Sequence, residues 1–157
     1  LAADLVLVSA GKTRTLALDD FFVGYRHTAL LPGEIVHSIR VPLPVPAKNR
    51  FYKVSKRPLD DIAIVSGAFA VDLDPGGRVT SARLAYGGVA PTPVRARATE
   101  AALVGRAWGA PAVAAVAGVL AGEFSPIDDH RASAAYRRHL VGALLDKFAH
   151  DSGEAVS

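Results

Sequence analysis

The chain has 157 residues, of which 50% are hydrophobic and 21% are charged, so it can bury a core and does not have the composition of a disordered protein. Its net charge of +3 is too small to predict a nucleic-acid partner. Because it contains no cysteine, its own residues cannot form disulfides, thiolate zinc sites or iron–sulfur ligands. This length suits one domain, or a small domain with part of another.

The chain has no run of about 18 apolar residues, so we expect no transmembrane helix and no membrane partner. Its first residues, LAADLVLVSAGKTR, lack the basic start and the long apolar stretch of a signal peptide. Met is absent throughout, including at the first position. We therefore expect the chain to be a piece of a longer protein.

The first third of the chain has the patterns of short strands. An apolar run at 5–8 and a loosely alternating run at 13–18 flank a turn that contains Gly11, which predicts a two-stranded ribbon. Residues 34–41 alternate between two faces, as in a strand. The prolines in 42–49 disfavour both a helix and a central strand, so we expect a connector and a domain boundary there.

A β-hairpin is expected from the middle of the chain. Residues 63–73 are rich in apolar and β-branched types, and residues 78–86 alternate. Between them stands Asp74-Pro75-Gly76-Gly77, a sequence typical of a tight turn.

Three helices are expected after the hairpin, at 99–104, 112–122 and 131–150. The last helix carries an apolar stripe formed by Tyr136, Leu140, Leu144 and Phe148. Its charged residues lie largely off that stripe: Arg137, Arg138, Asp146 and Lys147. Strands first and helices last predict an α+β fold, in which an antiparallel β-sheet built on the hairpin packs against C-terminal helices.

No arrangement of residues in the sequence is typical of a catalytic centre. None of the five histidines has the spacing of a metal-ligand motif, and the chain has no GxSxG elbow, GxGxxG loop or Walker loop. Residues 87–88 are a Gly pair after a strand, which suits either close approach to a ligand or a simple turn.

Two further features leave alternatives open. Asp60 and Asp61 follow a basic strand, and they suit either a ligand-binding loop or a helix cap with an ion pair. Tyr25 and Arg26 follow a glycine, and they suit either stacking on a ligand with neutralisation of a phosphate, or packing. On these residues alone the chain is an α+β domain with a candidate ligand site.

Five motifs occur in a fixed order along the chain: FFVGYRHT at 21–28, FYKVSKRPLDDIA at 51–63, YGGVA at 86–90, TE with Leu103 and Gly105 at 99–105, and FSPIDDHRASAAYR at 124–137. Together they resemble the flavoprotein component of xanthine-dehydrogenase-like molybdenum hydroxylases. The resemblance runs from about residue 5 to the C-terminus.

This resemblance implies two parts. Residues 1–46 are expected to end an FAD-binding domain of the PCMH type, as the terminal strands of a flavin-binding lobe, and residues 47–157 to form an α+β domain like the CO dehydrogenase flavoprotein C-terminal domain. The cofactor implied is FAD, of which this chain holds part of the site. The loops that hold the FAD pyrophosphate are expected before residue 1.

The resemblance also implies a multi-component oxidoreductase in the cytoplasm. Its members pass electrons from a molybdopterin centre through 2Fe–2S clusters to FAD, and usually on to NAD. The implied partners are a molybdopterin-binding large subunit, a ferredoxin-like 2Fe–2S domain and NAD. The isolated fragment is expected to be inactive.

The resemblance implies roles for five residues that match positions in the family's motifs. Val36 is expected to line the flavin, and Lys53 to contact FAD. Asp60 and Arg57 belong to a loop near the isoalloxazine, and Tyr25 to an aromatic position near the nicotinamide. Two further residues of the loop, Asp61 and Ile62, suit NAD contact or capping of the hairpin.

Pro58 and Leu59 replace a charged pair of the animal members, so loop switching of the animal kind is not expected. Within the family, a carbon-monoxide, nicotinate or aldehyde hydroxylase is the alternative to the xanthine type. From another class, the alternative is a non-catalytic docking fragment that does not hold FAD alone.

Overall fold

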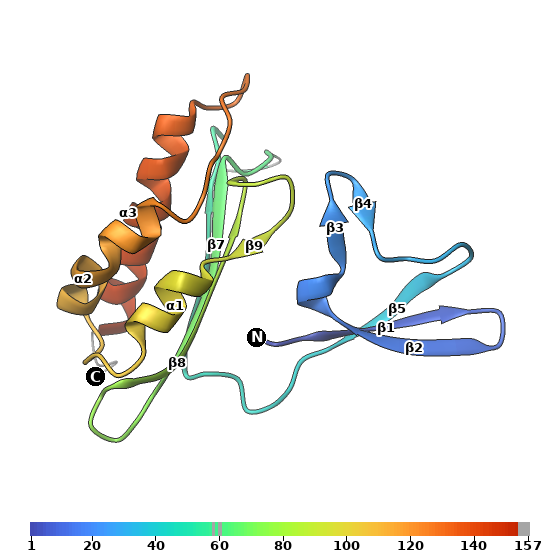
Figure 1. Ribbon diagram of the computed structural model, residues 1–157, viewed down its shortest axis with the longest axis horizontal. Coiled ribbons are helices and arrows are strands. Elements are labelled where there is room, and N and C mark those ends of the chain that lie inside the picture. Colours follow the sequence, from blue (N-terminus) through green and yellow to red (C-terminus); the bar gives the residue numbers. More distant parts are fainter. Residues whose placement is uncertain (58, 60, 154–157) are drawn as a thin grey trace. The chain divides into compact units, whose positions relative to one another are not determined.

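The computed structural model describes residues 1–57, 59 and 61–153, and it divides into two compact units, Leu1–Val45 and Pro46–Ser157 (Figure 1). The division falls inside the proline-containing segment 42–49. Each unit has its own buried cluster of apolar residues, and each is described by itself below.

The first unit is built on three antiparallel strands in the order β2-β1-β5: β1 Asp4–Ser9, β2 Lys12–Ala17 and β5 Ile35–Arg40. β1 lies in the middle, and its apolar residues form the small core with Phe21. A short 3-10 helix, η1 Leu18–Asp20, leads into a second, two-stranded sheet of β3 Phe22–Gly24 and β4 His27–Thr28. The expected ribbon and the strand at 34–41 are confirmed.

An ion pair fixes the turn before β5. The guanidinium of Arg14 donates to both carboxylate oxygens of Glu34 at 2.8 Å each, and to the carbonyl of Ala29 at 2.6 Å. The same carboxylate accepts the Leu31 backbone N–H at 2.8 Å. These hydrogen bonds, that of Arg14 first, lower the pKa of Glu34 to about 2, so the carboxylate stays charged at neutral pH.

The second unit is a four-stranded antiparallel sheet with three helices. The strands are β6 Lys48–Val54, β7 Val65–Leu73, β8 Val79–Gly87 and β9 Val94–Arg95, in the order β6-β7-β8-β9. The helices are α1 Arg97–Leu103, α2 Ala110–Ala121 and α3 Ala134–Gly153, and they cover one face of the sheet (Figure 1). The expected α+β fold, with its hairpin and three helices, is confirmed.

Aromatic side chains join the sheet to the helices. The ring of Phe69 on β7 lies 5.0 Å from Tyr86, 5.6 Å from Phe148 and 6.0 Å from Tyr52. Phe69 is almost completely buried because odd-numbered residues at this point of β7 face the helices. The hydroxyl of Tyr52 donates to Asp151 on α3 at 2.8 Å, which ties the edge strand β6 to the last helix.

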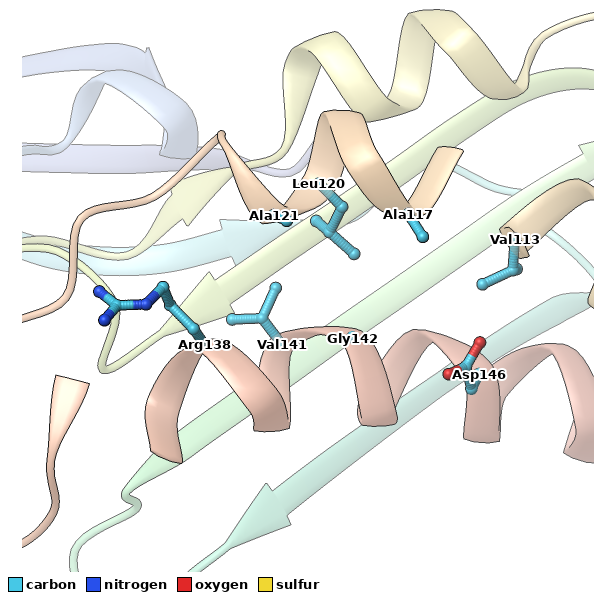
Figure 2. Close-up of a pocket in the computed structure, with 8 residues that line it drawn as sticks. All are labelled: Val113, Ala117, Leu120, Ala121, Arg138, Val141, Gly142 and Asp146. Carbon is cyan, nitrogen blue, oxygen red and sulfur yellow. The ribbon is translucent and has the colours of Figure 1, made fainter. Parts of the chain in front are cut away.

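Between α2 and α3 runs a shallow groove, in which Leu120 and Val141 face each other and Arg138 and Asp146 stand toward its two ends (Figure 2). The groove contains none of the residues that the sequence nominates for a site. None of the described helices is long and apolar enough to cross a membrane.

Replacing Phe69 by Ala is expected to destabilise the second unit by about 3–5 kcal/mol, because it removes a ring from the centre of the aromatic cluster and leaves a cavity. The fluorescence of Trp108, the single tryptophan, reports unfolding of this unit during chemical denaturation. The matched control is Phe51→Ala on β6, because Phe51 is 68% exposed and the loss of its ring should cost less than about 1 kcal/mol. Equal losses for the two variants would contradict the assignment of the two sheet faces.

Candidate functional site

The face of the second unit's sheet that the helices leave uncovered carries a cation and an aromatic ring. Along β6, Tyr52 and Val54 pack on the core between sheet and helices. Phe51 and Lys53 therefore point to the opposite face, because neighbouring residues of a strand alternate. Both side chains are exposed on that uncovered face, which we call the open face.

The middle of the open face is formed by small residues. Lys53 pairs with Ser66 on β7, which pairs with Gly87 on β8. In the next row of this face Phe51 is followed by two alanines, Ala68 and Ala85. Side chains that are paired across an antiparallel sheet lie on the same face, so these rows form a flat floor beside Lys53 and Phe51.

Lys53 makes no hydrogen bond and no ion pair with any residue that the structure describes. A free ammonium group beside a flat floor of small residues suits a planar ligand that carries or acquires negative charge. The residues of the open face thus fit a flavin ring. No group of three or more possible metal ligands occurs among the described residues.

The loop that follows β6 is closed at its base and braced inside. The Ile64 N–H donates to the Val54 carbonyl at 2.7 Å, which joins the two ends of segment 55–63. Within the loop, the Asp61 carboxylate accepts the N–H of Arg57 at 3.1 Å and that of Ile62 at 2.9 Å. Asp61 therefore braces the loop from within, and no described helix begins here for it to cap.

Burial opposes ionisation of Asp61, but the two backbone hydrogen bonds and the charges of Arg57 and Arg131 outweigh it and lower its pKa. The carboxylate is thus negative at neutral pH and holds Arg57 through an ion pair with Nε at 3.9 Å. Two predicted loop positions, Pro58 and Asp60, lie outside the described residues. The role expected for Asp60 stays a prediction.

A buried arginine on α3 holds the end of this loop. Arg137 is only 4% exposed, although the helical pattern placed it off the apolar stripe, so that expectation is wrong. Its Nη1 donates to the carbonyls of Ile64 at 2.6 Å and of Gly88 at 2.7 Å, and its Nη2 donates to both oxygens of Asp129 at 2.8 Å. These acceptors replace water around the two Nη groups of Arg137, while its buried Nε has no hydrogen-bond partner among the described residues.

Asp129 is itself oriented by the backbone before α3. Its Oδ1 accepts the N–H groups of Arg131 at 2.9 Å and of Ala132 at 3.0 Å. These backbone hydrogen bonds, followed by the bond from Arg137, lower the pKa of Asp129 to about 2. The carboxylate is therefore ionised at neutral pH, and it balances the charge of the buried guanidinium.

Gly87 and Gly88 allow β8 to end close to this cluster. Gly88 has φ +82°, and a Cβ there would lie against the Ile64 carbonyl oxygen and 3.2 Å from Arg137 Nη1. A Cβ at Gly87 would lie 2.6 Å from the Ser66 hydroxyl. Of the two roles considered for this Gly pair, the structure shows close packing of the turn against its own chain.

The two nominated residues of the first unit lie on different sheets. Val36 is on β5, paired with Leu7, and is 41% exposed. Tyr25 lies in the turn between β3 and β4 and is 66% exposed, with the Arg26 guanidinium 5.3 Å from the centre of its ring. The cation next to Tyr25 thus stacks on Tyr25 itself.

Of the five nominated residues, Lys53 lies on β6 and Arg57 in the loop that follows it, Val36 and Tyr25 lie in the first unit, and Asp60 is outside the described residues. Sequence reasoning did not nominate Phe51 or the pair formed by Asp129 and Arg137. The alternation of the strand could have predicted Phe51, because it stands two residues before Lys53 and therefore lies on the same face. The pair had no local signal, since its partners in the loop end and in β8 are far away in the sequence.

Comparison with known proteins matches both units to family models. Residues 50–152 match the CO dehydrogenase flavoprotein C-terminal domain, and residues 1–44 match the FAD binding domain in molybdopterin dehydrogenase. The first of these models covers most of the chain. The chain therefore belongs to the flavoprotein family of the molybdenum hydroxylases.

The chain is 40% identical over 149 residues to nicotinate hydroxylase hnxS and 39% identical over 151 residues to xanthine dehydrogenase, both of Emericella nidulans. These matches cover 89% and 94% of this chain but 11% of each fungal protein. It is 35% identical over 147 residues to the glyceraldehyde dehydrogenase medium chain of Sulfolobus acidocaldarius, covering 94% of this chain and 52% of that one.

Among solved structures, a chain of the reconstituted CO dehydrogenase from Oligotropha carboxidovorans matches with a TM-score of 0.85 and 29% identity. A chain of quinoline 2-oxidoreductase from Pseudomonas putida 86 matches with a TM-score of 0.83 and 26% identity. Each match covers 97% of this chain and 52% of the other. The chain thus spans about half of these structures and about a tenth of the fungal proteins.

The Gly88→Ala variant is expected to lose more stability than Gly105→Ala, its matched control. Both glycines have φ +82°, so both variants carry the cost of about 1–2 kcal/mol for a left-handed residue. Only at Gly88 does the added Cβ meet other atoms, which should add about 1–3 kcal/mol. Denaturation followed by Trp108 fluorescence measures the difference, and equal losses would show that β8 does not need this close approach.

Asp129→Asn is expected to lower the melting temperature at pH 7 and to have a diminishing effect as the pH falls from about 4 to about 2. Hydrogen bonds lower the pKa of Asp129 in the folded protein to about 2, below the ordinary 3.8 of an aspartate. Its stabilisation is therefore fully present above the unfolded pKa and is lost as the pH falls through the folded one. Melting curves of the wild type and the variant at several pH values test this, and a constant difference would refute it.

Proposed function

We propose that this chain is part of the FAD-containing electron-transfer component of a xanthine-dehydrogenase-like molybdenum hydroxylase. In this proposal residues 1–46 end the FAD-binding domain, and residues 47–157 form the C-terminal α+β domain of the flavoprotein. The observation that carries the proposal is that two flavoprotein family models match consecutive parts of the chain, over residues 1–44 and 50–152.

Lys53 is the residue of the open face with the clearest proposed role. When bound, FAD supplies the exchange of electrons between one-electron and two-electron donors and acceptors. The Lys53 ammonium places a fixed positive charge on an uncovered sheet face, where no described acid neutralises it. Such a charge stabilises negative charge that develops on a neighbouring ring or phosphate.

The other nominated residues have supporting roles in the proposal. Arg57 and Asp60 belong to the loop at the flavin edge, and the ion pair of Arg57 with Asp61 supports a defined path for the described part of this loop. Val36 offers an exposed apolar side chain to line the flavin, and Tyr25 an exposed aromatic ring near the nicotinamide of NAD.

We further propose that electrons reach the flavin from 2Fe–2S clusters and leave it to NAD. The donor clusters and the molybdopterin belong to partners, a ferredoxin-like domain and a large subunit. Relatives named for nicotinate, xanthine and glyceraldehyde are all 35–40% identical to this chain. This similarity across different substrates supports a role in electron transfer that all of them share, rather than in substrate choice.

The xanthine type is one of two proposals within the family, because the nicotinate hydroxylase and the xanthine dehydrogenase are almost equally similar, at 40% and 39% identity. The test is anaerobic mixing of the complete enzyme with xanthine, nicotinate, carbon monoxide or an aldehyde. Bleaching of the flavin absorbance by xanthine, and its return on adding NAD, are expected. If only another of these substrates bleaches the flavin, the enzyme is not of the xanthine type and is assigned to that substrate instead.

Replacing Lys53 by Ala in the full-length protein is expected to lower the FAD content or to slow NAD reduction by about tenfold, because a positive charge beside the flavin is lost. Flavin absorbance per protein and steady-state rates measure the two effects. Lys147→Ala removes the same charge on the helix-covered side of the sheet and is the matched control. Unchanged values for Lys53→Ala would remove Lys53 from the site.

A non-catalytic docking fragment is the alternative from another class. The 157-residue chain can be titrated with FAD and followed by flavin absorbance and fluorescence. Saturable binding would show that the fragment holds the cofactor by itself. Absence of binding would show that the fragment does not hold FAD alone. Its part in the FAD site would then have to be tested in the full-length protein.

A further inference from the structure

We propose that Arg137, held by Asp129, is a positioning residue that fixes the two limbs of the loop after β6, residues 55–57 and 61–63, and the Lys53 end of β6 against the rest of the second unit. The proposal rests on the proposed function in one respect, because that function makes this loop and Lys53 part of a flavin site. Arg137 acts through the backbone and is itself buried under the end of the sheet.

The first step is the carbonyl of Ile64. Ile64 is buried and precedes β7, and its N–H is used to close the loop on Val54. Its carbonyl accepts a hydrogen bond from Arg137 Nη1, and a buried carbonyl without a donor partner costs about 1–3 kcal/mol. The position of the loop end is therefore set by the guanidinium.

In the second step, one nitrogen of Arg137 binds two carbonyls. Nη1 of Arg137 also donates to the Gly88 carbonyl, and the absence of a Cβ at Gly88 lets that peptide approach Ile64. Two carbonyl oxygens repel each other unless a cation lies between them. Arg137 thus joins the end of β8 to the end of the loop.

The third step is the segment 129–132, which contacts both the arginine and the loop. Asp129 orients the guanidinium, while the neighbouring His130 carbonyl accepts Lys56 Nζ of the loop at 3.3 Å. The charge of Arg131 lowers the pKa of Asp61 on the other limb of the loop. One short segment therefore supports the arginine and both limbs of the loop.

The loop end that Arg137 holds is only a few residues away from Lys53 on the open face. Val54, at the base of the loop, directly follows Lys53, and Ser66, the partner of Lys53, stands two residues after Ile64. Since β6 is an edge strand with one neighbour, its Lys53 end depends on this closure. Loss of the Arg137 bridge should loosen the loop and the Lys53 ammonium together.

The test uses the full-length protein with Arg137→Lys, which keeps the charge but cannot bridge two carbonyls and a carboxylate with a planar fork. Trypsin cleavage between Lys56 and Arg57 measures opening of the loop, and it is expected to rise about tenfold or more, because cleavage follows the population of the open loop. Trp108 fluorescence during chemical denaturation checks that the variant is folded.

The second readout is the midpoint potential of the flavin, measured by spectroelectrochemistry, which a merely structural role would not move. We expect it to become more negative, because a loosened Lys53 stabilises the reduced flavin less. Arg95→Lys is the matched control, since Arg95 forms a similar two-pronged pair with Glu100, at 2.9 and 2.6 Å. It should change neither loop cleavage nor the potential.

A folded Arg137→Lys variant with unchanged loop cleavage would overturn the proposal. Faster cleavage with an unchanged potential would reduce Arg137 to a structural residue and overturn its positioning role. If the wild-type full-length protein holds no FAD, the proposed function fails, and the cleavage experiment still decides whether Arg137 fixes the loop.

Discussion

The second unit depends on one buried charge. Removing a guanidinium from water costs several kcal/mol, and the folded state compensates only where charge and hydrogen-bond acceptors are supplied together. For Arg137 these acceptors come from the Asp129 carboxylate and from the carbonyls of Ile64 and Gly88. The loop end, the end of β8 and the start of α3 must therefore be in place at the same time, because any one of them alone would leave the charge unsatisfied.

This constraint gives three separate sequence motifs one explanation. The DIA end of FYKVSKRPLDDIA leads directly to Ile64, the Gly pair of YGGVA contains Gly88, and the motif that ends in AYR contains both Asp129 and Arg137. The first two motifs by themselves suit a ligand-binding site, with charges or glycines after a strand, whereas the third follows helix α2. In the structure their residues hold one another, and the open face nearby carries Lys53 as its cation. The motifs describe the support of the proposed site more than its contacts.

Much of the architecture could be predicted from local patterns, since the hairpin has alternating strands around Asp74–Gly77 and the helices have apolar faces. Helical spacing places Arg137 on the buried face of α3, seven and eleven residues before Leu144 and Phe148, but it does not reveal what compensates a buried charge. Its burial is decided by Asp129, 8 residues away, and by Gly88 and Ile64, 49 and 73 residues away. No local rule of periodicity contains contacts at such separations.

The same reasoning separates the two kinds of residue at the open face. Lys53 and Phe51 are exposed and lack stabilising partners among the described side chains, so their identities contribute little to folding. Asp129 and Arg137 are fixed by several hydrogen bonds each, and changing either leaves the other's charge without its partner. An edge strand bearing a free cation has few contacts of its own, so the position of that cation must be fixed by the loop that follows the strand. That loop is in turn held by a side chain that never reaches the open face, which is why residues remote from a ligand can still set where its charged partner stands.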